Sequence, residues 1–281
     1  ANVDLSKNTA LKTLNMSDNT LSSITLPQTE TLTTLLLNNN LLTSVDLTKN
    51  TRLTELNVSY NNLMSLNVSK NTALTTLTAN SNSVRTISLP QSTTLTTLNV
   101  NSNALTSIDV SNCTALTNLY LGENQLTALD VSKNTKLKEI ECHSNRFTTL
   151  DFSKNSSLRK ISCYYNQIYD VPSGAQNGES FVANLPNIYQ NGFNHGDILF
   201  TTVTDANNLT KDQVSIASSK GWSMKFDDGS TYSGTAASAI EEVEVEDCDN
   251  DNAPRYNLNG QPVDDNYRGI VIQKGKKILV K

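Results

Sequence analysis

The chain has 281 residues, of which 37% are hydrophobic and 17% charged, and its formal net charge is -5. Uncharged Thr, Ser and Asn fill much of the rest, a bias typical of β-structure and turns rather than of helical bundles. The acidic balance, without any run rich in Lys or Arg, argues against nucleic acid as a partner. No stretch approaches the roughly 20 consecutive apolar residues of a membrane span, so we predict none in this chain.

A strict internal repeat organises the first part of the chain. Leucines recur every 21 residues without an insertion, at Leu11, Leu32, Leu53, Leu74, Leu95, Leu116, Leu137 and Leu158. Each leucine begins the pattern LxxLxLxxNxL, in which apolar and polar residues alternate as in a strand with one buried face. Because a single strand of this kind cannot close a core, we predict a solenoid whose coils bury their apolar residues against one another. The chain opens at Val3 in the second half of a repeat, so we expect an export signal or further repeats upstream.

An asparagine follows every predicted strand of the repeat. A sharp turn leaves backbone N–H and C=O groups buried outside the sheet, and a carboxamide can both donate to them and accept from them. We therefore predict a structural asparagine ladder, formed by Asn19, Asn40, Asn61, Asn82, Asn103, Asn124, Asn145 and Asn166. A second column is imperfect, with asparagine at Asn8, Asn50, Asn71, Asn134 and Asn155 but Thr29, Ser92 and Cys113 in between.

Residues 3–172 resemble the leucine-rich-repeat family, specifically the short-repeat surface proteins of Bacteroidetes, with internalins as more distant relatives. The resemblance implies a mainly β, right-handed solenoid over residues 1–172 with a parallel sheet on its concave side. In such proteins the exposed strand residues bind protein or glycan ligands, and the repeats carry no catalytic machinery. The resemblance also implies a bacterial protein that is secreted or held at the cell surface.

A small α+β cap is predicted for residues 173–234, after the period stops. A loop at 173–178 precedes a strand at 198–203, and Thr210 and Gln213 have the spacing of a helix capping box. Alternation from Trp222 to Phe226 predicts a further strand before the turn at 227–229. The terminal coil of a solenoid would otherwise expose its apolar face, so we expect this segment to cover it.

The C-terminal part of the chain divides into an acidic linker at 235–254 and a β tail at 255–281. Asp247, Asp249 and Asp251 match the opening of a calcium loop, but Asn252 and Leu258 replace the expected glycine and glutamate, so we predict no metal and no cofactor. The tail resembles the C-terminal β-modules of exported Bacteroidetes proteins, including type IX sorting domains. That resemblance implies a sorting or surface-display module, although a purely structural tail is the alternative.

Cysteines leave the redox setting open. Cys142 and Cys163 lie one period apart at inward strand positions, where their Cα spacing permits a disulfide. Parallel side-chain directions hold the Cβ atoms too far apart, so we favour two buried thiols.

Enzymatic activity is not expected. The two histidines, His143 and His195, belong to no recognisable nucleophile, metal or phosphate motif. Paired carboxylates occur, but a glycosidase needs two of them in a walled cleft, which a bare solenoid face does not provide.

A change in the outward strand residues locates the predicted binding site. Early repeats are monotonous, with Thr at 13, 34, 76 and 97 and Asn at 15, 57 and 99. From the sixth repeat, aromatic and charged residues replace them, at Asn118, Tyr120, Glu123, Glu139, Glu141, His143, Lys160, Tyr164 and Tyr165. Such a mixture is typical of protein and sugar recognition, so we predict an adhesin-like module that binds a host or bacterial surface protein, or a glycan. A structural spacer without a ligand is the alternative, which uniform Ser, Thr and Asn columns would favour. For Tyr164 and Tyr165, the alternative to ligand binding is packing under the cap.

Overall fold

The computed structural model describes residues 1–168, 181–201, 207 and 209–234, together with strands between 255 and 280. The chain divides into two compact units, Ala1–Gly234 and Thr235–Lys281. The expected loop at 173–178, the acidic linker and the Asp247–Asp251 segment lie outside the described residues.

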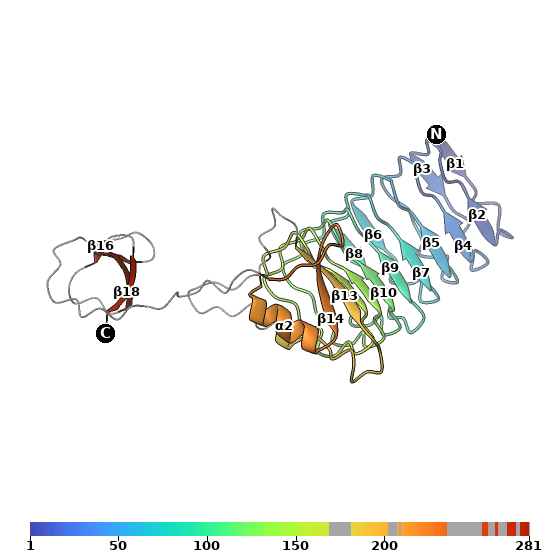
Figure 1. Cartoon of the computed structure of the whole chain (residues 1–281). Helices are drawn as coiled ribbons and strands as arrows, with labels where there is room; N and C mark the ends of the chain where they lie inside the picture. Colours follow the sequence, from blue (N-terminus) through green and yellow to red (C-terminus); the bar gives the residue numbers. More distant parts are fainter. Residues whose placement is uncertain are drawn as a thin grey trace. The chain divides into compact units, whose positions relative to one another are not determined.

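A parallel sheet of ten strands, called here the main sheet, runs the length of the first unit (Figure 1). Each coil contributes one short strand in register with the next, so that Leu119 pairs with Ile140 and Ile140 with Ile161. The predicted repeat solenoid is confirmed. The strands, in order along the sheet, are β2 (Thr13–Asn15), β4 (Thr34–Leu36), β5 (Glu55–Asn57), β7 (Thr76–Thr78), β9 (Thr97–Asn99), β10 (Asn118–Tyr120), β11 (Glu139–Glu141), β12 (Lys160–Ser162), β13 (Gly196–Thr201) and β14 (Trp222–Phe226).

The second half of the repeat forms another wall of the solenoid. Two short parallel pairs lie on it, β1 (Asn2–Asp4) with β3 (Ser23–Thr25) and β6 (Ser65–Asn67) with β8 (Thr86–Ser88). Between the walls, the central residue of every main-sheet strand from β4 to β12 is fully buried. Burial of one such side chain contributes roughly 1.5–3 kcal/mol, so stability accumulates coil by coil.

The asparagine after each main-sheet strand from β4 to β12 is tied to the neighbouring coil. Asn19, predicted as the first member of the ladder, is the exception, because its side chain donates only to the Met16 and Ser17 carbonyls of its own coil. Asn124 donates from Nδ2 to the carbonyl oxygens of Val100, Leu121 and Gly122, at 3.0–3.1 Å. Its Oδ1 accepts from the Leu105 N–H at 3.0 Å. The same arrangement recurs at Asn40, Asn61, Asn82, Asn103, Asn145 and Asn166. Each of these side chains must therefore both donate and accept.

The second asparagine column has a different requirement. Asn155 donates to the carbonyl oxygens of Val131 and Asn134, both at 2.9 Å, but its Oδ1 accepts no hydrogen bond from the described residues. Because only a donor is needed across the coils, a hydroxyl or a thiol can replace the amide. Ser92 donates to the Thr72 carbonyl and Cys113 to the Pro90 carbonyl, which explains why this column is imperfect.

The cap continues the main sheet. Strand β13 pairs in parallel with β12, placing Asp197 beside Lys160, and β14 pairs with β13. Helix α2 (Lys211–Ser219) begins with the predicted capping box of Thr210 and Gln213. The strand expected at 198–203 begins two residues earlier, at Gly196, because Asp197 pairs with Lys160 of β12 and Gly196 pairs with Trp222 of β14.

The second unit contains a four-stranded antiparallel sheet in the order β16-β15-β17-β18. Its strands are β15 (Arg255–Asn257), β16 (Pro262–Val263), β17 (Gly269–Gln273) and β18 (Lys276–Val280). Strands β17 and β18 pair in antiparallel fashion along their full length.

Three cysteines of the first unit are buried and form no disulfide. Cys142 and Cys163 face inward on neighbouring coils without a disulfide, as favoured from the sequence, and Cys113 lies in the second asparagine column. Burial raises the pKa of Cys142, and it raises that of Cys113 to about 11.

Candidate binding site on the main sheet

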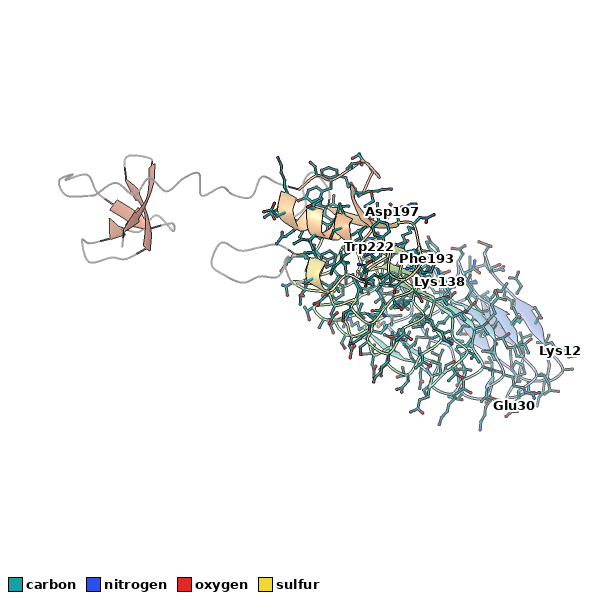
Figure 2. All side chains as sticks on the ribbon, turned by 60° about the horizontal axis from the view of Figure 1, so that its bottom comes forward. Lys12, Glu30, Lys138, Phe193, Asp197 and Trp222 are labelled. Atoms are coloured by element: carbon teal, nitrogen blue, oxygen red, sulfur yellow. The ribbon has the colours of Figure 1, made fainter. Side chains whose placement is uncertain are left out.

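The outward face of the main sheet changes its chemistry along the solenoid. The first outward column carries threonine in β2, β4, β7 and β9, interrupted by Glu55 in β5. It then carries Asn118, Glu139, Lys160 and Asp197 in β10 to β13. Figure 2 shows Asp197 and Lys138 near the cap end of the solenoid, and Lys12 and Glu30 near the other end. The nine predicted site residues, called here the polar patch, belong to the coils next to the cap.

Glu139 is the centre of a hydrogen-bonded network. Its Oε1 accepts from Lys160 Nζ at 2.6 Å, and its Oε2 accepts from Asn118 Nδ2 and from the Tyr120 hydroxyl, both at 3.3 Å. Asn118 Nδ2 also lies 3.1 Å from the Tyr120 hydroxyl oxygen. Charge-assisted bonds of this kind hold the side chains in one arrangement before a ligand arrives. The ion pair is partly solvated, and it raises the pKa of Lys160, which therefore keeps its charge.

Glu141 connects this network to the coil of β9, two coils before its own. Its Oε2 accepts from Asn101 Nδ2 at 3.2 Å, and its Oε1 lies 4.0 Å from Lys160 Nζ. Asn101 Oδ1 in turn accepts from the Gly122 N–H at 2.7 Å. Residues from the coils of β9, β10 and β12 thus help to fix the position of the Glu141 carboxylate.

Aromatic rings form the other half of the polar patch. The His143 and Tyr164 rings stack in parallel, with their centroids 4.6 Å apart and their planes inclined by 3°, and Tyr165 meets Tyr164 edge-on at 5.5 Å. His143 also covers Gly122, where an added Cβ would lie 2.5 Å from the imidazole Nε2. Gly122 therefore provides the space that lets the imidazole lie flat. Burial lowers the pKa of His143 although Glu141 and Glu123 act in the opposite direction, so the ring is neutral at pH 7.

Glu123 and Tyr165 project from turns with an unusual backbone. The residue before each ladder asparagine has a left-handed conformation, with φ of 54° at Glu123 and 51° at Tyr165. Glu123 accepts a hydrogen bond from the Ser102 hydroxyl at 2.7 Å. Tyr165 is 45% exposed, and Tyr120 and Tyr164 are half-buried. The tyrosines are thus not enclosed by the cap, in contrast to the alternative in which they pack under it.

The structure corrects the assignment of Tyr164 to a column. We expected it in the columns of the strand residues, but Ser162 follows Glu141 in register and is buried. Tyr164 lies two residues later, in the column of Gly122 and His143. This displacement brings the tyrosine against the imidazole rather than against the carboxylate network.

Sequence reasoning missed three charged residues that the cap adds to this face. Asp197 and Lys225 lie on β13 and β14 and form an ion pair at 2.9 Å. Asp227, directly after β14, is exposed and contributes to raising the pKa of Tyr164. No repeat signal marks these positions, since the cap strands do not follow the 21-residue period. Asn101 was also missed, although its place in the column of His143 could have indicated it.

The described residues offer no group of three His, Cys, Asp or Glu side chains arranged to hold a metal ion. Among those residues, too, no helix has the length and apolar character needed to cross a membrane. What the polar patch provides is a set of fixed hydrogen-bonding groups, carboxylates and ring edges on an open sheet.

Comparison with known proteins identifies the fold. The sequence matches no protein-family model and no curated protein. The chain is similar to the leucine-rich repeat domain of APL1B, with 23% identity, a TM-score of 0.53, and coverage of 75% of this chain and 66% of that one. It is also similar to YopM, a leucine-rich effector protein from Yersinia pestis, with 21% identity, a TM-score of 0.52, and coverage of 72% and 56%. Both similarities place the first unit among the leucine-rich-repeat folds.

The functional domain of InlJ from Listeria monocytogenes has 30% identity and a TM-score of 0.47, over 59% of this chain and 42% of that one. The chain thus spans only 42–66% of the length of these three proteins.

Proposed function

We propose that the chain is a non-catalytic, extracellular binding module that recognises a protein or glycan through the polar patch on the main sheet. One observation carries the proposal: the outward columns change from threonine and asparagine to a connected set of charged and aromatic groups within three coils. Uniform columns of threonine and asparagine only keep the exposed face of a sheet polar and hydrated, whereas aromatic rings beside fixed hydrogen-bonding groups are typical of recognition surfaces.

The geometry of the polar patch suits binding because its side chains are already held in place. Glu139, Glu141 and Asn118 are half-buried and hydrogen-bonded, so a ligand would immobilise few further rotamers on contact. Ordering a free side chain costs about 0.5–1.5 kcal/mol, and a preformed network avoids much of that cost. We expect affinity to depend on a few central residues, foremost Tyr120 and Glu141.

Catalysis is not part of the proposal. The carboxylates of the polar patch lie on an open sheet face and are engaged by Lys160, Asn118 and Asn101. A general acid or nucleophile needs a group that is free to exchange protons or attack inside an enclosed site, and no such arrangement supports an enzymatic role here.

The second unit supports a proposal about location. Its small antiparallel sheet and its terminal sequence resemble sorting modules of exported bacterial proteins, so we propose that it directs the solenoid to the cell surface of a bacterium. Deleting residues 255–281 should leave the main sheet folded by circular dichroism but change where the protein is found. Unchanged surface display of the truncated protein would contradict this assignment.

An array experiment tests the binding function. The full chain is applied to glycan and surface-protein arrays beside a variant carrying Tyr120→Ala and Glu141→Ala. The matched control carries Asn57→Ala and Thr78→Ala, which change the same column in earlier strands. We expect ligands captured by the parent chain to be lost by the first variant and retained by the control, with both variants within about 1 kcal/mol of parental stability.

Two outcomes would count against the proposal. Capture that survives in the Tyr120 and Glu141 variant would move the ligand site away from the polar patch. If the parent chain captured nothing on either array, the structural spacer would become the better account.

A further inference from the structure

A column of threonines runs along the amino ends of the main-sheet strands. Each threonine donates from its hydroxyl to the carbonyl oxygen of the residue one coil earlier, at 2.9–3.2 Å. The members of this column are Thr33, Thr54, Thr75, Thr96 and Thr117. Lys138 and Arg159 take the next two positions, where the main chain continues the contact without a hydroxyl, the Arg159 N–H donating to the Lys138 carbonyl at 2.8 Å. These two coils therefore carry a cation where the earlier coils make an additional hydrogen bond.

Exposed lysines gather on the same two coils. Lys133 and Lys154 lie one period apart on the coils of β11 and β12, and Lys136 and Lys138 follow Lys133 directly before β11. We call these four exposed lysines the basic edge. Residues 133–160 contain seven of the chain's 22 Lys and Arg residues but three of its 27 Asp and Glu residues, although the whole chain has a net charge of -5. The local charge is thus opposite to that of the chain.

The neighbouring carboxylates do not neutralise the basic edge. Asp130 and Asp151 precede its two turn lysines by three residues, and each accepts from the main-chain N–H of a nearby serine at 2.8 Å. Glu139, next to Lys138 in the sequence, is bound to Lys160 at 2.6 Å. The ion pairs formed between described residues include none of the four lysines. The two aspartates offset the turn lysines, so the charges of the other two lysines remain and favour an anionic partner.

The composition of the basic edge narrows the class of partner. Thr135, Ser156 and Ser157 lie beside its lysines in the sequence, and the leucines there, Leu137 and Leu158, are fully buried. Contacts with a partner would therefore be made through charges and hydrogen bonds rather than through apolar side chains. An ammonium group is a compact point charge that suits the oxygens of a sulfate ester, whereas a planar carboxylate is best matched by the fork of arginine. Groups of lysines on a surface are typical of sites for heparin-like polyanions.

We propose that the basic edge binds a linear sulfated glycan that runs across the coils of β11 and β12. Strands of neighbouring coils lie about 4.8 Å apart, so one short segment of glycan can reach the lysines of both coils. The site adjoins the polar patch, since Lys138 directly precedes β11, but it uses different side chains and does not depend on the proposed function.

A heparin oligosaccharide serves as the probe. It is immobilised through its reducing end, and binding of the full chain is measured by surface plasmon resonance. A desulfated oligosaccharide of the same length and a poly-glutamate peptide are the comparisons. We expect the sulfated oligosaccharide to bind at least about tenfold more tightly than either of them, and its affinity to fall as salt screens the lysines.

Two double variants locate the effect. Lys136→Ser with Lys138→Thr introduces the residue types that neighbouring coils have in these columns, and the new hydroxyl can donate to the Thr117 carbonyl. The control, Arg52→Ser with Lys12→Thr, removes two charges from the same two columns in early coils, and Figure 2 shows Lys12 near the end of the solenoid that is remote from Lys138. The first variant should weaken heparin binding about tenfold and the control should leave it unchanged. Urea unfolding verifies that both variants are folded.

Four outcomes would overturn the inference. No binding of the heparin oligosaccharide would do so, and so would equally tight binding of poly-glutamate, which would indicate an acidic protein as the partner. Equal losses in the two double variants would indicate a response to net charge alone. Heparin binding that is lost in the Tyr120→Ala, Glu141→Ala variant but kept in the lysine variant would place the glycan on the polar patch, so the proposed function would stand while the basic edge would not.

Discussion

The two asparagine columns predict different costs for the same substitution. Asn145 donates to the carbonyl oxygens of Leu121, Cys142 and His143 and accepts from the Leu126 N–H at 2.9 Å. A serine there is too short to serve both coils, so Asn145→Ser should leave at least two buried backbone groups without partners. Each such group costs about 1–3 kcal/mol, and we expect a total near 3 kcal/mol.

Asn155→Ser is the matched comparison. Asn155 donates to two carbonyls, and serine already occupies the equivalent position at Ser92, where its hydroxyl donates across the coils. The expected cost is about 1 kcal/mol or less, since the requirement for a donor is still met. Urea unfolding followed by far-UV circular dichroism and by the fluorescence of Trp222, the single tryptophan, measures both costs. Equal destabilisation by the two substitutions would refute the distinction between the columns.

Three further predictions concern acid, thiols and the cap. Asp109 and Asp130 each accept hydrogen bonds from the serine two residues later, and these bonds lower the pKa of both carboxyl groups. Their contribution to the free energy of unfolding is therefore present above the ordinary carboxyl pKa range and is lost as pH falls through the folded-state pKa. The urea midpoint of an Asp109→Asn, Asp130→Asn variant should therefore fall less between neutral and acidic pH than that of the parent chain, and an equal fall would contradict this. Cys248, the fourth cysteine of the chain, is replaced by Cys248→Ser so that only the other three can be labelled. In this background Cys113 and Cys142 should resist a thiol reagent near pH 8 until urea is added, because burial raises the pKa of both, and rapid labelling of the native chain would be the contrary result. Truncation of the chain before the cap, at residue 173, should expose the apolar end of the last coil and cause aggregation, which size-exclusion chromatography detects. A truncated monomer with an unchanged melting temperature would show that the cap is dispensable.

The repeat could be predicted from the sequence because its physical cause is periodic. Leu119, Ile140 and Ile161 fill equivalent positions, and a fixed spacing without insertions translates directly into register. The position of the ladder asparagines follows from the same spacing. The full set of hydrogen bonds that these asparagines make does not follow from the spacing, because it depends on which carbonyl groups the left-handed turn directs inward.

The cap shows where the period stops being informative. Asn207 acts as a further ladder rung, donating to the Cys163 and Phe200 carbonyls and accepting from the Ile168 N–H at 2.9 Å. It lies 41 residues after Asn166 instead of 21, so no column pointed to it. Asp197 was missed for the same reason, since its pairing with Lys160 arises only because β13 joins the main sheet.

The candidate site was predicted in its composition but not in its arrangement. All nine residues lie on the coils next to the cap, yet Tyr164 belongs with His143 rather than with Glu141. A shift of two residues along a strand keeps the same face but changes the column. Contacts between side chains of different coils, such as Asn101 with Glu141, depend on rotamers that a single sequence does not specify.

Carboxylate footprinting tests the binding surface most directly. The full chain, with and without a ligand identified on the arrays, is labelled with a carbodiimide and glycine amide at the carboxylates that solvent reaches, exposed or half-buried. The extent of labelling at each position is read by mass spectrometry. The account predicts that the ligand protects Glu123, Glu139 and Glu141 while labelling of Glu30 and Glu55 stays unchanged. Protection of Glu55, or unchanged labelling of the polar patch in a saturated complex, would contradict it.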